Sequence, residues 1–322
     1  MKKIFYSIMA LAAVSIMSVS CNKFLSPQGT SGSEETASDG KFDVNFKFVT
    51  AGSVESKAVQ EAQVSKINDV QIFVFDSTRN DVIETYYKGT SASGKIRLTP
   101  GKKKIRALVN APALGSGIGK LSDFDSVLSE FSKNTADNFV MSGSLSVEIK
   151  SEASLPIVVR RLAAKIVLKQ IRTDFSAPIY ADAKFTVNDI YLTNVAVKCK
   201  YFGLSYTNTE WNKGFDITKD TGIDKEVKNN VYDTEHVFYA YPNSSKDKPT
   251  RIVLKATLGS TVGYYPIDLG KIESNKVYTV TDLLITRPGG DNEDIPVVSA
   301  EFPYTVAVDG WDSDVTQVEE II

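Results

Sequence analysis

Histidine and cysteine are scarce in this sequence. Its 322 residues include one histidine, His236, and two cysteines, Cys21 and Cys199. This scarcity argues against a zinc-type site, a disulfide framework and a histidine-based catalytic triad. We therefore interpret His236 as a packed or surface residue and Cys199 as a small buried apolar side chain, and we expect neither an enzyme nor a bound cofactor or metal.

An excess of charge of one sign is also lacking. The formal net charge is -2, with both signs mixed along the chain, so nothing in the electrostatics favours a nucleic acid partner. The basic run 102–104 follows the turn pair Pro100-Gly101 and reads as a solvated strand edge. The acidic stretch 291–294 lacks the alternating oxygen ligands of a calcium loop, which favours an exposed connector.

A nucleotide-binding loop is not indicated by the glycines at 115, 117 and 119. Their spacing is GxGxG rather than GxGxxG, and no P-loop lysine follows them, so we interpret them as a flexible crossover. A short helix is predicted directly after this crossover, because Ser122 and Asp125 can form a capping box. The apolar stripe of that helix would consist of Phe124, Val127, Leu128 and Phe131.

The most apolar run lies at the amino end and is too short for a membrane-spanning helix. A basic start precedes an apolar run over residues 4–19, whereas a spanning helix needs about 20 such residues. The pattern is typical of a secretory signal, which we assign to residues 1–20. The run ends in SVSC, which looks like a bacterial lipobox in which Cys21 receives lipid. An ordinary signal peptide with an incidental cysteine is the alternative.

Residues 41–57 contain a strand that could be cut free of the chain it helps to fold. Its apolar residues alternate with polar ones, the period of a half-buried strand. They are Phe42, Val44, Phe46 and Phe48. Upstream, residues 21–40 are rich in Ser and Gly and are expected to form a disordered tether. Downstream, the stretch ends at Lys57, a trypsin-like cleavage point.

Strand-like segments continue from there to the carboxyl end, so we predict a mainly β fold. Within residues 67–76, the apolar density from Val70 to Phe75 predicts a central strand. Pro156 interrupts the pattern, and we place a first domain at 41–155 and a second at 156–322. The segment RRLAAKIVL at 160–168 is predicted as a strand, with a short helix as the alternative. The polar insertion 207–230 is predicted as a surface loop that carries Trp211 and Phe215.

The order of these parts resembles the type V pilins, the FimA-like fimbrillins of Gram-negative gut and oral bacteria. The resemblance spans essentially the whole chain. It rests on the lipobox, the alternating first strand and the basic residue after it, and on the segments KKKIRALVNAPA, VVRRLAAKIVL, KIESNKVYTVTDLLITRPGG and FPYTVAVDGW.

This resemblance implies two transthyretin-like β-sandwich domains, with a short helix in the first. It implies export as an outer-membrane lipoprotein and removal of the first strand by a trypsin-like surface protease between Lys57 and Ala58. The trimmed subunit would then polymerise with other copies and other fimbrial subunits by donor-strand exchange, in an extracellular fimbrium that supports adhesion.

The expected donor strand is the tail after Trp311, at the carboxyl end of the second domain. Its apolar contacts would come from Val315, Val318, Ile321 and Ile322. Because its alternation is imperfect, a longer donor that includes Tyr304, Val306 and Val308 is the alternative. Two other functions compete with a polymerising subunit. They are a membrane-retained anchor or accessory fimbrial subunit, and a glycan-binding surface lipoprotein with Trp211 as its platform.

Overall fold

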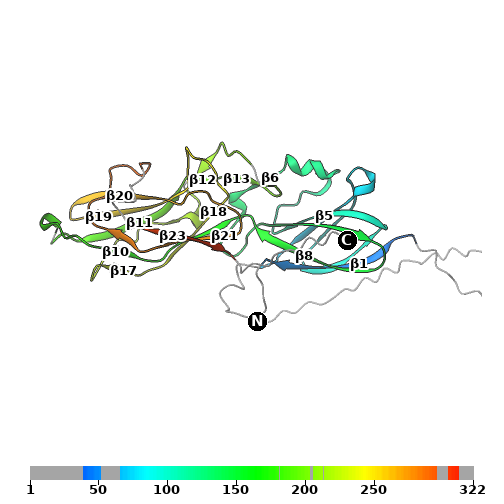
Figure 1. Cartoon of the computed structure of the whole chain (residues 1–322), viewed down its shortest axis with the longest axis horizontal. Coiled ribbons are helices and arrows are strands. Elements are labelled where there is room, and N and C mark those ends of the chain that lie inside the picture. Colours follow the sequence, from blue (N-terminus) through cyan, green and yellow to red (C-terminus); the bar gives the residue numbers. More distant parts are fainter. Residues whose placement is uncertain are drawn as a thin grey trace, which may run out of the picture. The chain divides into compact units, whose positions relative to one another are not determined.

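The computed structural model describes residues 39–51, 66–180, 182–203, 206–212, 214–295 and 304–311. The described residues from Gly40 onward belong to one compact unit, drawn in Figure 1. They form β-strands and short 3-10 turns, so the expectation of a mainly β fold is confirmed. No helix in these ranges is long and apolar enough to cross a membrane.

Several predicted features lie outside the described residues. They are the signal 1–20, the tether up to residue 38, Cys21, Lys57, Ala58, and the tail residues Val315, Val318, Ile321 and Ile322.

The first part of the chain forms a seven-stranded sheet with the order β3-β2-β5-β7-β8-β1-β4. The strands are β1 (Phe42–Thr50), β2 (Val70–Asp76), β3 (Val82–Gly89), β4 (Ser93–Leu98), β5 (Gly101–Val109), β7 (Met141–Ile149) and β8 (Ala153–Arg161). Between β7 and β8 the pairing is limited to Met141 with Arg161 and Ser142 with Arg160. The strands β8, β1 and β4 therefore form one layer and β3, β2, β5 and β7 another, joined at this corner.

A shared apolar core lies between these two layers. Every strand except β3 contributes fully buried side chains to it, because each presents alternate residues inward. Its members include Val44, Phe46 and Phe48 of β1, Ile72 and Val74 of β2, Ile96 and Leu98 of β4, Ile105 and Ala107 of β5, Met141 of β7, and Ile157 and Val159 of β8. The opposite face of β2, with Phe73 and Phe75, packs into a second core. Strand β2 is thus buried on both faces, which confirms the predicted central strand.

The helix expected after the glycines is not an α-helix. The segment forms η3 (Leu121–Asp125), the short strand β6 (Leu128–Glu130) and η4 (Phe131–Lys133). The predicted capping box is also wrong, because the carboxylate of Asp123 accepts the backbone N–H groups of Gly119 and Lys120 at 2.7 and 2.8 Å. Phe124 and Phe131 are buried from the two turns. Between these two turns, pairing with β13 (Lys198–Lys200) keeps the residues of β6 extended.

Two further 3-10 turns in the first part are η1 (Ser77–Arg79) and η2 (Gly115–Gly117). The first connects β2 to β3, and its Asp76 carboxylate accepts the N–H of Thr78. The second occupies the glycine segment interpreted as a crossover.

The second part of the chain forms several smaller sheets around the second core. One has the order β18-β9-β21-β23, a second β17-β10-β22 and a third β15-β11-β19-β20, with β16 also paired to β11. Their bounds are β9 (Ala164–Leu168), β10 (Ile171–Thr173), β11 (Phe185–Thr193), β15 (Lys219–Asp220), β16 (Lys225–Glu226), β17 (Val231–Tyr232), β18 (His236–Ala240), β19 (Arg251–Leu258), β20 (Thr261–Asp268), β21 (Lys276–Thr281), β22 (Leu283–Ile285) and β23 (Thr305–Gly310).

The segment RRLAAKIVL is extended, so the strand prediction is confirmed over the helix alternative. It is shared by two sheets, because β8 ends at Arg161 and β9 begins at Ala164. The change of sheet therefore occurs at residues 162–163. The boundary proposed at Pro156 falls inside β8.

The insertion 207–230 is more ordered than a surface loop. It forms β14 (Trp211–Asn212), paired with β12 (Val195–Ala196), as well as η6 (Asp216–Thr218), β15 and β16. The ring of Phe215 meets Phe131 edge-on at 4.8 Å, and Trp211 packs half-buried against the second core. Apolar contacts with residues distant in sequence pack this segment against the second core. Its polar composition does not indicate these contacts. The remaining turn is η5 (Pro178–Tyr180).

His236 and Cys199 have the packed positions expected of them. His236 is 6% exposed, with Nδ1 2.6 Å from Asp220 Oδ2 and Nε2 2.8 Å from the hydroxyl of Tyr232. Cys199 is a buried free thiol, and burial raises its pKa well above the usual value.

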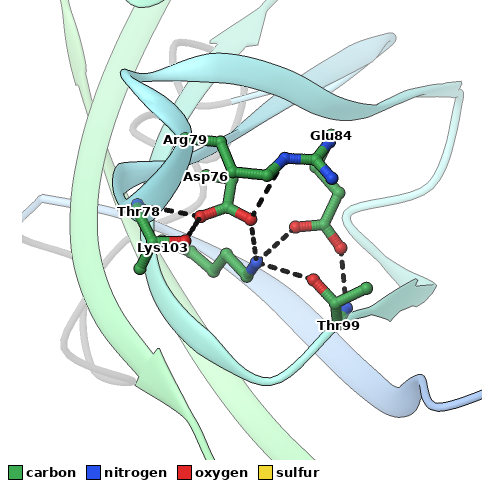
Figure 2. Close-up of polar contacts among 6 residues, drawn as sticks. All are labelled: Asp76, Thr78, Arg79, Glu84, Thr99 and Lys103. Atoms are coloured by element: carbon green, nitrogen blue, oxygen red, sulfur yellow. Dashed lines mark hydrogen bonds and ion pairs between the residues drawn. The ribbon is translucent and has the colours of Figure 1, made fainter.

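The basic run 102–104 is not a solvated edge throughout. Lys103 of β5 is 1% exposed, and its ammonium group lies between the carboxylates of Asp76 and Glu84, as Figure 2 shows. Lys104 pairs with Asp81 at a more exposed position. Strand alternation puts Lys103 on an inner face, and the two carboxylates there make its burial possible.

Candidate assembly groove

Strand β1 is inserted between two other strands rather than added at an edge. It pairs in parallel with β8, from Val44 opposite Ala153 to Thr50 opposite Val159. It pairs antiparallel with β4 on its other side, from Phe42 opposite Leu98. Figure 1 shows β1 and β8 running side by side. Removal of β1 would leave two facing strands with unpaired backbone groups and a gap between them.

The inner face of β1 confirms the alternation read from the sequence. Val44, Phe46 and Phe48 are 0%, 2% and 4% exposed, whereas Phe42 is half-buried at the start of the strand. Burial of one such side chain contributes about 1.5 to 3 kcal/mol, so these three together contribute about 5 to 9 kcal/mol as an upper bound. That sum is comparable with the whole stability of a small domain.

The ring of Phe46 packs against two neighbouring aromatic rings. Its ring meets the ring of Tyr87 edge-on at 5.0 Å and that of Phe48 at 5.8 Å. Gly94 of β4 lies opposite in the ladder, and a Cβ there would stand 2.6 Å from Phe46 Cζ. The missing side chain at Gly94 therefore gives the ring its space.

The outer face of β1 is held to β4 by charge. The Asp43 carboxylate lies 2.9 Å from Lys95 Nζ and 3.6 Å from Arg97 Nε. The hydrogen bond from Lys95 holds the pKa of Asp43 below its ordinary value, with smaller contributions from the charges of both cations. These groups are partly exposed, so they set the register more than they add stability.

Two backbone hydrogen bonds fasten the far end of the strand. The N–H of Phe48 donates to the carbonyl of Ala92 at 2.7 Å, and the N–H of Ala51 donates to Val159 at 2.9 Å. Sequence reasoning identified the inward residues of β1. It missed β8 as the parallel partner, as well as Gly94 and Tyr87, because no local pattern indicates contacts across the sheet.

The described chain ends next to the last residue of β8. Trp311 stacks on Tyr239 with ring centres 5.7 Å apart, and the guanidinium of Arg161 lies 4.6 Å from the Trp311 ring centre. The Trp311 N–H donates to the carbonyl of Asn275. The expected donor tail starts directly after this anchor. Of the longer donor considered above, Val306 and Val308 belong to β23, which pairs with β21 in the chain's own sheet.

Within the described ranges, no group of His, Cys, Asp and Glu side chains is placed to hold a metal ion. The arrangement around β1 can instead bind an extended segment, through main-chain hydrogen bonds on both sides and pockets for alternate side chains.

Comparison with solved structures relates the whole architecture to known proteins. A fimbrilin (FimA) from Porphyromonas gingivalis superimposes with a TM-score of 0.64 at 16% identity, covering 85% of this chain and 98% of that one. A protein from Bacteroides eggerthii, provisionally described as a cell adhesion protein, gives a TM-score of 0.63 at 20% identity, with coverage of 85% and 98%. The fold is thus the two-domain fold of fimbrillins.

Sequence comparison matches adjoining parts of the chain to two fimbrial families, whose matches overlap close to the change of sheet. A protein of Parabacteroides distasonis, provisionally named fimbrium tip subunit Fim1C, is 24% identical over 253 residues, which are 67% of this chain and 68% of the relative. The family model of the major fimbrial subunit protein (FimA) matches residues 42–168, and that of the Fim1C-like fimbrium tip subunit, C-terminal domain, matches residues 162–277. The two matches run without a gap from residue 42 to residue 277, and the chain belongs to the FimA-like fimbrillins, a family of fimbrial subunit proteins.

Proposed function

We propose that this fimbrial subunit is assembled by donor-strand exchange, with β1 as the strand that is exchanged. The precursor is exported as a lipoprotein through Cys21 and is trimmed between Lys57 and Ala58 by a trypsin-like protease. The observation that carries this proposal is the inserted position of β1, whose loss would open a gap between β8 and β4.

The energetics of β1 explain why the precursor stays monomeric before trimming. While β1 is in place, its apolar side chains fill the gap and its backbone satisfies both neighbouring strands. After its loss, exposed apolar surface and unpaired backbone groups disfavour the open state in water. A strand from another copy can restore both kinds of contact, which drives association.

We assign the donor role to the tail that follows Trp311, with Val315, Val318, Ile321 and Ile322 as its apolar contacts. The anchoring of Trp311 against Arg161 and Tyr239 supports this assignment, because it fixes the point from which the tail departs. A donor at one place and an acceptor at another make a head-to-tail contact, which builds a filament rather than a closed dimer.

The amino terminus of the protein purified from cells tests the processing step. A mature chain that begins at Ala58 supports a polymerising subunit, at the shaft or the tip of a fimbrium. A chain that keeps lipidated Cys21 and β1 would identify a membrane-retained anchor or accessory subunit instead. Sequencing of the mature amino terminus distinguishes the two.

Lys57→Ala is expected to leave a folded, lipidated monomer without filaments. Lys66→Ala is the matched control, since it removes a second basic residue on the carboxyl side of β1 and should leave filaments unchanged. Normal filaments from Lys57→Ala would contradict the assignment of the cleavage point. Saccharide titration addresses the glycan-binding alternative, against which the packing of Trp211 on the second core already counts.

A further inference from the structure

Strand β4 depends on β1 more than any other strand of the first sheet. It stands at the end of the sheet order, so β1 is its one ladder neighbour among the described strands. The strand on the other side of β1, β8, also pairs with β7 and so keeps a ladder neighbour without β1. When β1 leaves, β4 loses all of its ladder hydrogen bonds while it forms one wall of the gap. Something else must hold β4 if the gap is to keep its shape.

A buried polar cluster lies at the carboxyl end of β4 and is drawn in Figure 2. The N–H of Thr99, the residue after β4, donates to Glu84 Oε1 of β3 at 2.6 Å. The ammonium of Lys103 donates to Thr99 Oγ1 at 2.8 Å and lies 2.5 Å from Glu84 Oε2. Thr99 is therefore tied both to β3 and to β5, two strands of the opposite layer.

The cluster is balanced in charge, so it can persist away from water. Lys103 Nζ also lies 3.3 Å from Asp76 Oδ2, and Arg79 reaches the same carboxylate at 3.8 Å from the rim. Thr78 donates its N–H and its hydroxyl to the other oxygen of Asp76. Two cations thus face two carboxylates, and the side chains of Lys103, Asp76 and Glu84 are 0%, 8% and 7% exposed. Removal of one partner alone would leave a buried charge unpaired.

The opposite end of β4 has contacts of another kind. There the ring of Phe46 covers Gly94, and the N–H of Phe48 donates to Ala92. Both contacts come from β1 and disappear with it. The two ends of β4 therefore differ, because the bonds of Thr99 to Glu84 and Lys103 do not involve β1.

We propose that Glu84 and Lys103 are positioning residues that clamp β4 through Thr99, so that the gap left by β1 stays open and preformed for a donor strand. This inference rests on the proposed strand exchange. A preformed site binds more tightly than one that must order a strand on binding. The clamped end, beside Leu98, is where an incoming strand finds β4 in place, and the end beside Ala92 is ordered as the donor pairs.

Two double variants test the clamp without leaving a buried charge unpaired. Glu84→Leu with Lys103→Met removes both bonds to Thr99. Glu84→Gln with Lys103→Met keeps an acceptor for the Thr99 N–H and removes the bond to its hydroxyl. Ile105→Val is the control, because it weakens the same core while the bonds of Thr99 to Glu84 and Lys103 are kept.

The assay uses the full chain, nicked by trypsin on the carboxyl side of β1, and a fluorescent synthetic peptide of residues 41–51. Uptake of the peptide in place of β1 is followed by anisotropy. We expect the Glu84→Leu/Lys103→Met variant to bind the peptide about tenfold more weakly than the wild type, chiefly through slower association. The Glu84→Gln/Lys103→Met variant should bind the peptide with an affinity between those of the wild type and the Glu84→Leu/Lys103→Met variant. Ile105→Val should associate with the peptide at the wild-type rate.

The outcomes separate this inference from the function on which it rests. Equal association rates in the wild type and both double variants would overturn the clamp while leaving strand exchange intact. A slowing that Ile105→Val shares at equal loss of stability would also overturn it. A nicked wild-type chain that takes up no peptide under conditions that release β1 would overturn strand exchange, and the clamp with it.

Discussion

Gly94 of β4 lies opposite Phe46 of β1, and the absence of a side chain at Gly94 makes room for the phenyl ring. A Cβ at residue 94 would stand 2.6 Å from Phe46 Cζ and 3.1 Å from the hydroxyl of Tyr87. The contact joins β1 to β4, its antiparallel neighbour. It therefore decides which side chains a strand can carry at this position.

Gly94→Ala should lower the free energy of unfolding by about 1 to 3 kcal/mol, because the added methyl group forces the Phe46 ring out of its seat. In a Phe46→Leu background the same substitution should cost less, since the shorter side chain vacates that space. A double-mutant cycle by urea denaturation measures the coupling between the two residues. Equal costs in both backgrounds would show that the ring does not need Gly94.

Gly143→Ala should destabilise the corner where β7 meets β8. A Cβ at Gly143 would stand 2.3 Å from the carbonyl oxygen of Val158 and 3.0 Å from Val159 Cγ1. Because a backbone atom cannot move aside as a side chain can, we expect a loss of about 2 kcal/mol or more in the free energy of unfolding. Gly117→Ala is the control, since nothing lies within 4 Å of its Cβ position. Thermal melts of the two variants should differ clearly, and similar melts would contradict the crowded corner.

Acid should weaken the fold partly through Asp76. Hydrogen bonds from Thr78, together with Lys103, hold the pKa of this carboxyl below its ordinary value of 3.8. A carboxyl with a lowered pKa in the fold contributes stability above the unfolded pKa and loses it as the pH falls through the folded one. The free energy of unfolding should therefore drop as the pH falls below about 4.

Urea midpoints measured across this range test the contribution of Asp76. Thr78→Val should shrink the acid-dependent loss, because it removes the hydroxyl that donates to the carboxylate. Asp76→Asn should remove this contribution altogether. Ser77→Ala takes a hydroxyl from the same turn and serves as the control. Parallel pH curves for the wild type and Asp76→Asn would refute the assignment.

Trp311 should contribute to the stability of the fold through its contacts with Tyr239 and Arg161. Trp311→Ala removes the stack on Tyr239 and the contact with Arg161, and should cost about 2 kcal/mol of unfolding free energy. Trp311→Phe should recover part of that loss. Deletion of Asp314 to Ile322, in contrast, should leave monomer stability unchanged and yield processed subunits that cannot donate a strand. Wild-type polymer length after the deletion would place the donor elsewhere.

Local patterns predicted much of the fold. The alternation in β1 and the apolar density of β2 follow from the two-residue period of a strand, which is a property of a few neighbouring residues. The prediction of a helix after the glycines was wrong because it, too, relied on a few neighbouring residues. Phe124 and Phe131 have the spacing of a helical stripe, but pairing with β13, some seventy residues onward by the numbering, holds residues 128–130 extended.

The sequence by itself determined that the chain is built from strands, that its first strand has one apolar face, and that it has almost no histidine or cysteine for a zinc-type site or a catalytic triad. Only the tertiary structure decided that this strand lies between β8 and β4 and that Lys103 is buried among carboxylates. The reason is physical. The period of a strand is fixed within a few residues, whereas the neighbours of a strand and the burial of a charge depend on residues brought together from distant parts of the chain.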